Sequence, residues 1–250
     1  MNFYTVKLAP DAAELSRLKE ELQSVGLSWT ERLDRKYDAA DLRSAPLVRL
    51  IVRRKEEGYG GPTYGTTYDL AEACPTCGTG AIQTSPLRLD PTQIPESGAI
   101  FETLDGELLV SRAVARELGG LTGVELNQAE TAGGGRMDWF QVIPLAHMPR
   151  MASSTKGLRR WKPCSTCDRD GYFEGTEPLE AAYRAHNLPE ELHDFYSTWE
   201  RFGKSVLRAP FHESSFANPL ILVSARAQDI LAAASKAVEF VPVTLEDSSE

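Results

Sequence analysis

The spacing of apolar and polar residues near the N-terminus predicts a strand, a helix and a second strand. Residues 3–8 alternate between apolar and polar side chains, as a half-buried strand does. Residues 11–25 place three leucines and a valine on one helical stripe, with Asp11 as the N-cap and Gly26 as the stop. Residues 47–52 form a short apolar run that is typical of a buried strand.

Two glycine-rich stretches predict loops. Residues 58–65 contain four glycines but neither a Gly-Lys-Ser/Thr ending nor a G-x-G-x-x-G pattern, so a loop is a better interpretation than a phosphate site. Residues 133–135 are three consecutive glycines that are expected to turn a hairpin ahead of a strand at 139–145.

A weak internal repeat organises the rest of the chain. Residues 108–126 are predicted to form a strand, a helix and a strand, and residues 221–240 show the same order. Ser111 and Ser224 stand at the two helix starts, where a hydroxyl can accept a free backbone N–H. We therefore interpret both serines as helix caps and not as nucleophiles.

Residues 177–203 are predicted to form a helical insertion between the second cysteine pair and the second repeat. Each of its two segments, 178–186 and 189–202, begins with a proline, which is well tolerated in a first helical turn. An aromatic stripe at positions i, i+4 and i+7 is formed by Phe195, Trp199 and Phe202. The stripe is expected to pack in the core, with an exposed partner-binding face as the alternative.

All four cysteines fall into two Cys-x-x-Cys pairs: Cys74, Cys77, Cys164 and Cys167. Two residues between thiolates let both sulfurs face one point, and two such turns supply the four soft ligands of a tetrahedral zinc site. Because residues 78–163 separate the pairs, the pattern does not describe a compact zinc finger. A shared metal would join distant parts of the chain, and four thiolates leave no open position for catalysis.

Other interpretations of the cysteines stay open. A disulfide in each pair implies an oxidising compartment, but the N-terminus has no apolar signal stretch. A redox pair usually begins a helix, whereas Gly78, Gly80 and Gly171 follow the pairs here. Iron in place of zinc, separate sites or an empty site are the remaining alternatives.

These elements predict an α+β fold with mixed sheets and packed helices. The chain is expected to be a single globular unit, residues 1–250, with an N-terminal segment at 1–73. A first zinc-knuckle half at 74–145 and a second at 146–245 would each carry a strand-helix-strand unit and share the four-cysteine zinc site.

Composition and charge narrow the function. The chain has 27 basic and 36 acidic residues, a net charge of −9. An acidic surface repels nucleic acid and suits a basic protein partner, so no nucleic acid is expected as a partner. No apolar run is long enough to cross a bilayer, so a cytoplasmic protein without membrane contact is predicted.

No catalytic motif is recognisable, and the chain is not expected to be an enzyme. No serine lies in a nucleophile-elbow frame. The histidines are scattered and lack the spacing of a metal hydrolase: His147, His186, His193 and His212. Two small basic clusters are interpreted as surface charge: Arg53, Arg54 and Lys55, and Arg159, Arg160 and Lys162.

The cysteine pairs and the C-terminal pattern together resemble a known family. Cys-Pro-Thr-Cys-Gly at 74–78, Cys-Ser-Thr-Cys-Asp-Arg-Asp-Gly at 164–171, and a Val-Ser strand end, helix and Glu-Phe strand at 222–243 are similar to the myxobacterial double-CXXCG motif family. The likeness extends over roughly residues 74–243. One departure is Asp168, where the family's second motif has glycine; it leaves the cysteine ligands in place.

The characterised members of that family are immunity proteins of swarm-inhibition polymorphic toxin systems. The resemblance therefore implies that this chain binds and neutralises a cognate toxin, such as a nuclease, encoded by an adjacent gene. The alternatives are a zinc-stabilised regulator or adaptor, binding nucleic acid through Arg159, Arg160, Lys162 and Arg169 or binding another protein, and a redox enzyme that uses the cysteines.

Overall fold

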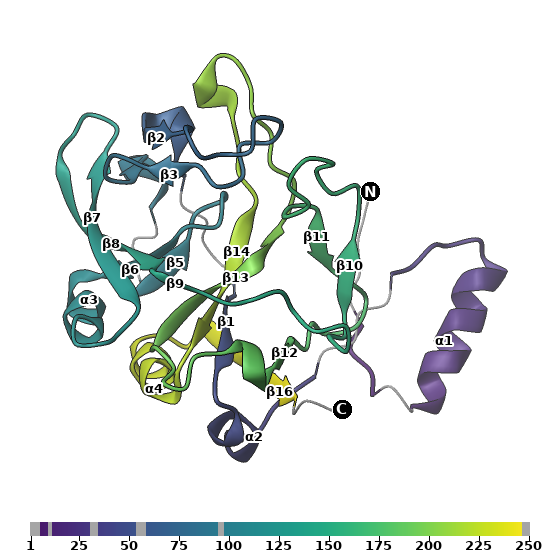
Figure 1. The fold of residues 1–250 in the computed structure, drawn as a ribbon. Helices are drawn as coiled ribbons and strands as arrows, with labels where there is room; N and C mark the ends of the chain where they lie inside the picture. The colour runs from purple at the N-terminus through teal and green to yellow at the C-terminus, as the bar shows by residue number, and fades with distance from the viewer. Residues whose placement is uncertain (1–5, 10–11, 31–34, 54–58, 95–97, 247–250) are drawn as a thin grey trace.

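Two large β-sheets and four α-helices dominate the part of the chain that the computed structural model describes, residues 6–9, 12–30, 35–53, 59–94 and 98–246 (Figure 1). The α-helices are α1 (Ala13–Ser24), α2 (Ala39–Ser44), α3 (Arg112–Leu118) and α4 (Ala225–Ala234). Short 3-10 helices cover Pro62–Tyr64, Pro91–Gln93, Ala185–Asn187 and Phe211–Glu213. Within these residues, no helix has both the length and the apolar character needed to cross a membrane.

The larger sheet is mixed and has seven strands in the order β10-β11-β13-β14-β1-β15, with β9 paired to β13. The pairs β11–β13 and β9–β13 are parallel and the others are antiparallel. Its strands are β1 (Val48–Val52), β9 (Ala146–His147), β10 (Leu158–Arg160), β11 (Tyr172–Glu174), β13 (Phe195–Phe202), β14 (Asn218–Val223) and β15 (Val238–Pro242).

The second large sheet has five strands in the order β4-β7-β8-β6-β5, and only the pair β4–β7 is parallel. Its strands are β4 (Arg88–Leu89), β5 (Ile100–Glu102), β6 (Leu108–Ser111), β7 (Val124–Thr131) and β8 (Arg136–Pro144). Two small pairs complete the structure: β2 (Tyr68–Asp69) with β3 (Ile82–Gln83), and β12 (Ala182–Arg184) with β16 (Thr244–Glu246). The predicted α+β class with mixed sheets is confirmed.

Both predicted strand-helix-strand units are present, as β6-α3-β7 and β14-α4-β15. In each unit an antiparallel strand lies between the two outer strands: β8 between β6 and β7, and β1 between β14 and β15. Ser224 caps α4 by accepting the N–H of Ala227 at 3.3 Å, as predicted. Ser111 occupies the N-cap of α3 without a side-chain hydrogen bond, so that part of the prediction is wrong.

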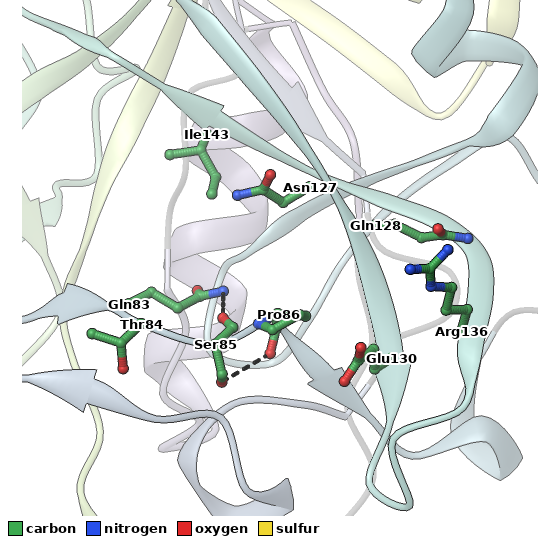
Figure 2. Close-up of a pocket in the computed structure, with 9 residues that line it drawn as sticks. All are labelled: Gln83, Thr84, Ser85, Pro86, Asn127, Gln128, Glu130, Arg136 and Ile143. Carbon is green, nitrogen blue, oxygen red and sulfur yellow. Dashed lines mark hydrogen bonds between the residues drawn. The ribbon is translucent and has the colours of Figure 1, made fainter.

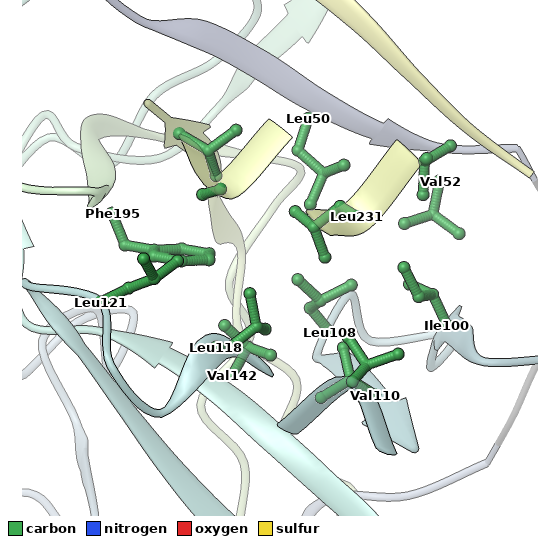
Figure 3. Close-up of a cluster of buried hydrophobic side chains, with 14 of the residues drawn as sticks. Leu50, Val52, Ile100, Leu108, Val110, Leu118, Leu121, Val142, Phe195 and Leu231 are labelled. Carbon is green, nitrogen blue, oxygen red and sulfur yellow. The ribbon is translucent and has the colours of Figure 1, made fainter. Parts of the chain in front are cut away.

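The largest buried cluster joins α3 and α4 to both large sheets (Figure 3). Leu118 of α3 and Leu231 of α4 are fully buried, and Leu108 of β6, Leu50 of β1 and Phe195 of β13 pack in the same cluster. Burial of such side chains stabilises a fold by about 1.5–3 kcal/mol each. Each large sheet therefore shields apolar side chains of the other sheet from water.

The predicted helical insertion at 177–203 is wrong. All of these residues are described, and they form β12, the 3-10 turn Ala185–Asn187 and the long strand β13. The first four residues of β13 are all buried, because the strand pairs on both edges and has core on both faces. The helical spacing of the aromatic residues is a coincidence in a strand that buries polar as well as apolar side chains, among them Ser197 and Thr198.

The N-terminal predictions hold only in part. Val6, Lys7 and Leu8 form no strand, and residues 3–5 lie outside the described residues. α1 confirms the predicted helix, although Ala12 is its N-cap and Asp11 lies outside the described residues. None of its residues is buried, and α1 lies away from the two large sheets in Figure 1. The stretch 47–52 and the hairpin turn at 133–135 are confirmed as β1 and the β7–β8 turn.

The shared core predicts that Leu231→Ala destabilises the whole fold. Leu231 is fully buried between the sheets, so its truncation leaves a cavity and should reduce the free energy of unfolding by about 2–5 kcal/mol. Urea unfolding followed by tryptophan fluorescence measures this. Leu145→Ala is the control, because Leu145 is 57% exposed and its truncation should change stability by less than about 0.5 kcal/mol. A similar loss for both variants would contradict the prediction.

Candidate metal centre

The four cysteine side chains converge on one point. Their Sγ atoms all lie within 4.8 Å of one another, and they are the one cluster of potential metal ligands found among the described residues. Cys74 and Cys164 have their sulfurs 3.8 Å apart, and Cys77 and Cys167 have theirs 3.6 Å apart. Four sulfurs bound to a tetrahedral zinc at about 2.3 Å lie about 3.8 Å from one another. The cluster therefore has the dimensions of a four-thiolate metal site.

Each cysteine pair lies in the connection between two antiparallel strands. Residues 74–80, the first knuckle, connect β2 and β3; residues 164–171, the second knuckle, connect β10 and β11. The same hydrogen bond closes both turns: Gly78 donates its N–H to the carbonyl of Cys74 at 2.8 Å, and Asp168 donates to Cys164 at 3.0 Å. The knuckles also meet through their hydroxyls, since Thr76 and Thr166 lie 2.8 Å apart.

Asp168 takes the backbone conformation that a glycine would take. Its φ is +61°, close to the +75° of Gly78 at the matching place in the first knuckle. Aspartate is among the few non-glycine residues that tolerate this left-handed region. Glycine is required at 78 for a second reason, because a Cβ there would lie 2.5 Å from the ring of Phe216.

Polar contacts join the knuckles without any metal. The buried carboxylate of Asp170 accepts the N–H of Cys164 at 2.7 Å and the N–H of Ser205 at 3.1 Å. The hydroxyl of Ser205 lies 3.2 Å from that of Thr79, which in turn lies 3.1 Å from the sulfur of Cys77. Ser205 thus connects one cysteine of each knuckle and holds the thiols near one another. No sequence motif marks this residue.

The electrostatics of the cluster favour a bound cation. Burial raises the pKa of the Cys77 thiol to about 12 and also raises that of Cys167. Burial acts in the same sense on Cys164, but backbone N–H groups of Cys167 and Thr166 outweigh it and lower its pKa to about 7. Thiolates this close together repel one another, and a divalent cation removes that repulsion. The donor set therefore fits a soft or borderline metal such as zinc.

The same geometry argues against two other interpretations of the cysteines, a disulfide in each pair and a redox-active pair. All four cysteines are free, and their closest sulfurs are too far apart for an S–S bond. Neither pair begins a helix, because residues 74–80 and 164–171 form turns. The thiols therefore lack the helix N-terminus that usually activates a redox pair.

The histidines and the described residues of the two basic clusters identified in the sequence do not form a common site with the cysteines. His147 accepts or donates a 2.6 Å hydrogen bond at Nδ1 with Ser197, and no histidine joins the cysteine cluster. Arg159 and Arg160 are consecutive on β10, so their side chains lie on opposite faces. Arg160 forms an ion pair with Asp168. Of the basic cluster at 53–55, only Arg53 lies within the described residues, and it pairs with Glu239.

A polar groove of about 440 Å³ lies between β7–β8 and the segment after β3 (Figure 2). Gln83 forms a reciprocal amide pair with Gln141 at 2.9 and 3.0 Å beside it. It contains no cysteine or histidine, and no sequence pattern marks it. The residues that line it are Gln83, Thr84, Ser85, Pro86, Asn127, Gln128, Glu130, Arg136 and Ile143.

Comparison with known proteins adds no assignment. No protein-family model matches the sequence, and no curated protein matches it significantly. The resemblance to the double-CXXCG motif family therefore stays a prediction that rests on the residues themselves.

The contacts of Asp170 predict that Asp170→Asn destabilises the protein by about 2 kcal/mol. An amide has one acceptor oxygen, so one of the two buried N–H donors would face another donor. Urea unfolding in the presence of zinc measures the loss. Asp138→Asn is the control: that carboxylate is 81% exposed and pairs with Arg112, so we expect a change below about 0.5 kcal/mol. Equal stability of the two variants would show that the buried carboxylate is dispensable.

Proposed function

We propose that the protein is a binding protein whose fold is held by one structural zinc ion, and that it neutralises a cognate toxin. The single observation that supports a structural metal is the use of all four cysteines in one cluster of 4.8 Å. Cys74, Cys77, Cys164 and Cys167 fill a tetrahedral ion's coordination sphere, so no position is left for a substrate or a reactive water. The metal's contribution is then to folding.

The two halves are proposed to be diverged copies of one unit. Each has a knuckle between antiparallel strands, followed by a strand-helix-strand unit with one antiparallel strand inserted. The inserted strand comes from different places: β8 follows β7 directly, whereas β1 comes from the N-terminal part of the chain. This supports a common arrangement of strands in both halves, in which the second half uses β1 from the N-terminal part of the chain. It also explains why residues before the first knuckle are integral to the fold.

Neutralisation of a toxin is supported by the family resemblance of the knuckles and the C-terminal unit. A single-partner inhibitor needs a stable scaffold and an exposed contact surface, and it needs no catalytic group. The net charge of −9 is suited to a basic toxin such as a nuclease. The nucleic-acid-binding alternative is less well supported, because Arg159 and Arg160 lie on opposite faces of β10 and Arg160 is paired with Asp168.

Loss of one ligand should release the metal and lower the melting temperature. Serine is a poor ligand for zinc, and Cys77→Ser also leaves three thiols crowded in a buried site. We expect a loss of about 4 kcal/mol, which lowers Tm by roughly 8–16 °C in a chain of this size. Differential scanning calorimetry and metal analysis measure both effects.

The control is Ser165→Ala, which changes an exposed position inside the second knuckle that is not a ligand. It should keep one metal per chain and the Tm of the wild type. X-ray absorption should show four sulfur neighbours and identify zinc or iron. An unchanged Tm for Cys77→Ser, or two metal ions per chain, would contradict a shared structural site.

The neutralisation proposal predicts that this protein protects cells from the product of a neighbouring gene. Cells that express that product should die without this protein and survive with it, and the two purified proteins should elute as one complex of fixed stoichiometry. An unrelated toxin of the same chemistry is the control and should not be neutralised. Absence of both rescue and complex would reject the immunity function and favour a zinc-stabilised regulator.

A further inference from the structure

The chain segment that contains β10 is basic, although the chain as a whole is acidic. Residues 147–169 contain six basic side chains and one acidic side chain, whereas the whole chain carries a net charge of −9. This segment includes β10 and most of the second knuckle. A local charge of opposite sign to the rest of a protein favours a partner that is oppositely charged at that place.

One face of the β10–β11 pair concentrates cationic and aromatic side chains, which we call the β10 surface: Arg159, Trp161, Lys162 and Phe173. Arg159 lies directly opposite Phe173, with its guanidinium carbon 5.6 Å from the ring centre. Trp161 packs edge-on against Phe173 at 6.2 Å, and the Lys162 ammonium lies 5.1 Å from the Trp161 ring. Trp161 is nevertheless 53% exposed.

The two cations of this surface have no carboxylate partner among the described residues, although their neighbour Arg160 pairs with Asp168. Arg159 and Lys162 are both exposed. Lys162 holds a left-handed backbone, φ +44°, and its carbonyl accepts a 2.5 Å hydrogen bond from Lys204. Lysine rarely adopts this conformation, and such strain concentrates at functional positions.

β10 is also an open sheet edge. It pairs with β11 alone among the described strands and stands at the end of the seven-stranded order. Trp161 donates its N–H to the carbonyl of Gly171 at 2.8 Å, so Trp161 and Arg159 belong to hydrogen-bonded pairs. The backbone groups of Leu158 and Arg160 therefore point away from β11, toward the free edge. An extended segment of another chain can bind such groups as an added strand.

We propose that the β10 surface is the docking site for an extended acidic segment of the protein partner, added as a strand along β10. The site rests on the proposed function, because it assumes a protein partner. Acidic side chains would reach Arg159 and Lys162, and an apolar side chain would cover Trp161, a residue type enriched at interface hot spots. Two unpaired cations on an acidic protein would neutralise few phosphates, and the affinity of proteins for nucleic acids comes largely from the number of phosphates that they neutralise.

The test compares two double charge reversals in complex formation with the neighbouring gene's product. Arg159→Glu with Lys162→Glu should raise the dissociation constant by about 30-fold or more, because the two new carboxylates repel the acidic segment. Trp161→Ala should also raise the dissociation constant, and it does so without changing the charge of the surface. The control, Arg116→Glu with Lys236→Glu, makes the same charge change at exposed positions near the α3 and α4 ends and should leave affinity within about threefold.

Hydrogen exchange supplies a second measurement. The amides of Leu158 and Arg160 should exchange more slowly in the complex, because the added strand accepts their N–H groups. A wild-type complex that the β10 variants leave unchanged would overturn the docking site alone. A wild-type chain that binds nothing would overturn the neutralising function as well. Saturable binding of a single-stranded oligonucleotide, lost in the β10 variants, would assign the surface to nucleic acid instead.

Discussion

The rest of the structure depends on the approach of four thiols from two distant knuckles. Four sulfurs within 4.8 Å, three of them on buried cysteines, repel one another when ionised, so the chain must either keep them protonated or neutralise them with a cation. Asp170 accepts backbone N–H groups of Cys164 and Ser205, and the Ser205 hydroxyl contacts Thr79 of the first knuckle, so the knuckles are also held by contacts between oxygen and nitrogen atoms. The site is thus assembled by the polypeptide, and a bound metal would replace the repulsion between the crowded thiolates with four metal–sulfur bonds.

The cysteine cluster and the largest apolar cluster connect different sheets. The first knuckle belongs to the small β2–β3 pair and the second to the β10–β11 edge of the seven-stranded sheet. Elsewhere in the molecule, α3 and α4 pack into one apolar cluster that contains side chains from both large sheets. Burial of apolar surface therefore joins the two large sheets, whereas the cysteine cluster and its hydrogen bonds join the β2–β3 pair to the seven-stranded sheet.

The sequence predicted the features that local chemistry determines. The cysteine pairs, the glycine turn at 133–135 and both strand-helix-strand units follow from spacing over a few residues, and the structure contains each of them. The helix predicted at the position of β13 was wrong because the aromatic spacing there also fits a helix. The strand is set instead by its pairing with β14, β9 and β11 and by apolar clusters on both of its faces, which come from elsewhere in the chain. Ser205 and Asp170 could not be recognised, because their role exists only after the knuckles meet.

Asp168 shows how the metal centre and the sheet edge are joined. A glycine at this place would satisfy the turn equally well, since the requirement on the backbone is a φ of +61°. Aspartate adds a carboxylate that pairs with Arg160 of β10 and lies 3.8 Å from Arg150. That ion pair neutralises the cation on one face of β10 and leaves Arg159 and Lys162 unpaired on the other. The replacement of glycine by aspartate thus keeps the knuckle's shape while ordering the charges on the adjacent strand.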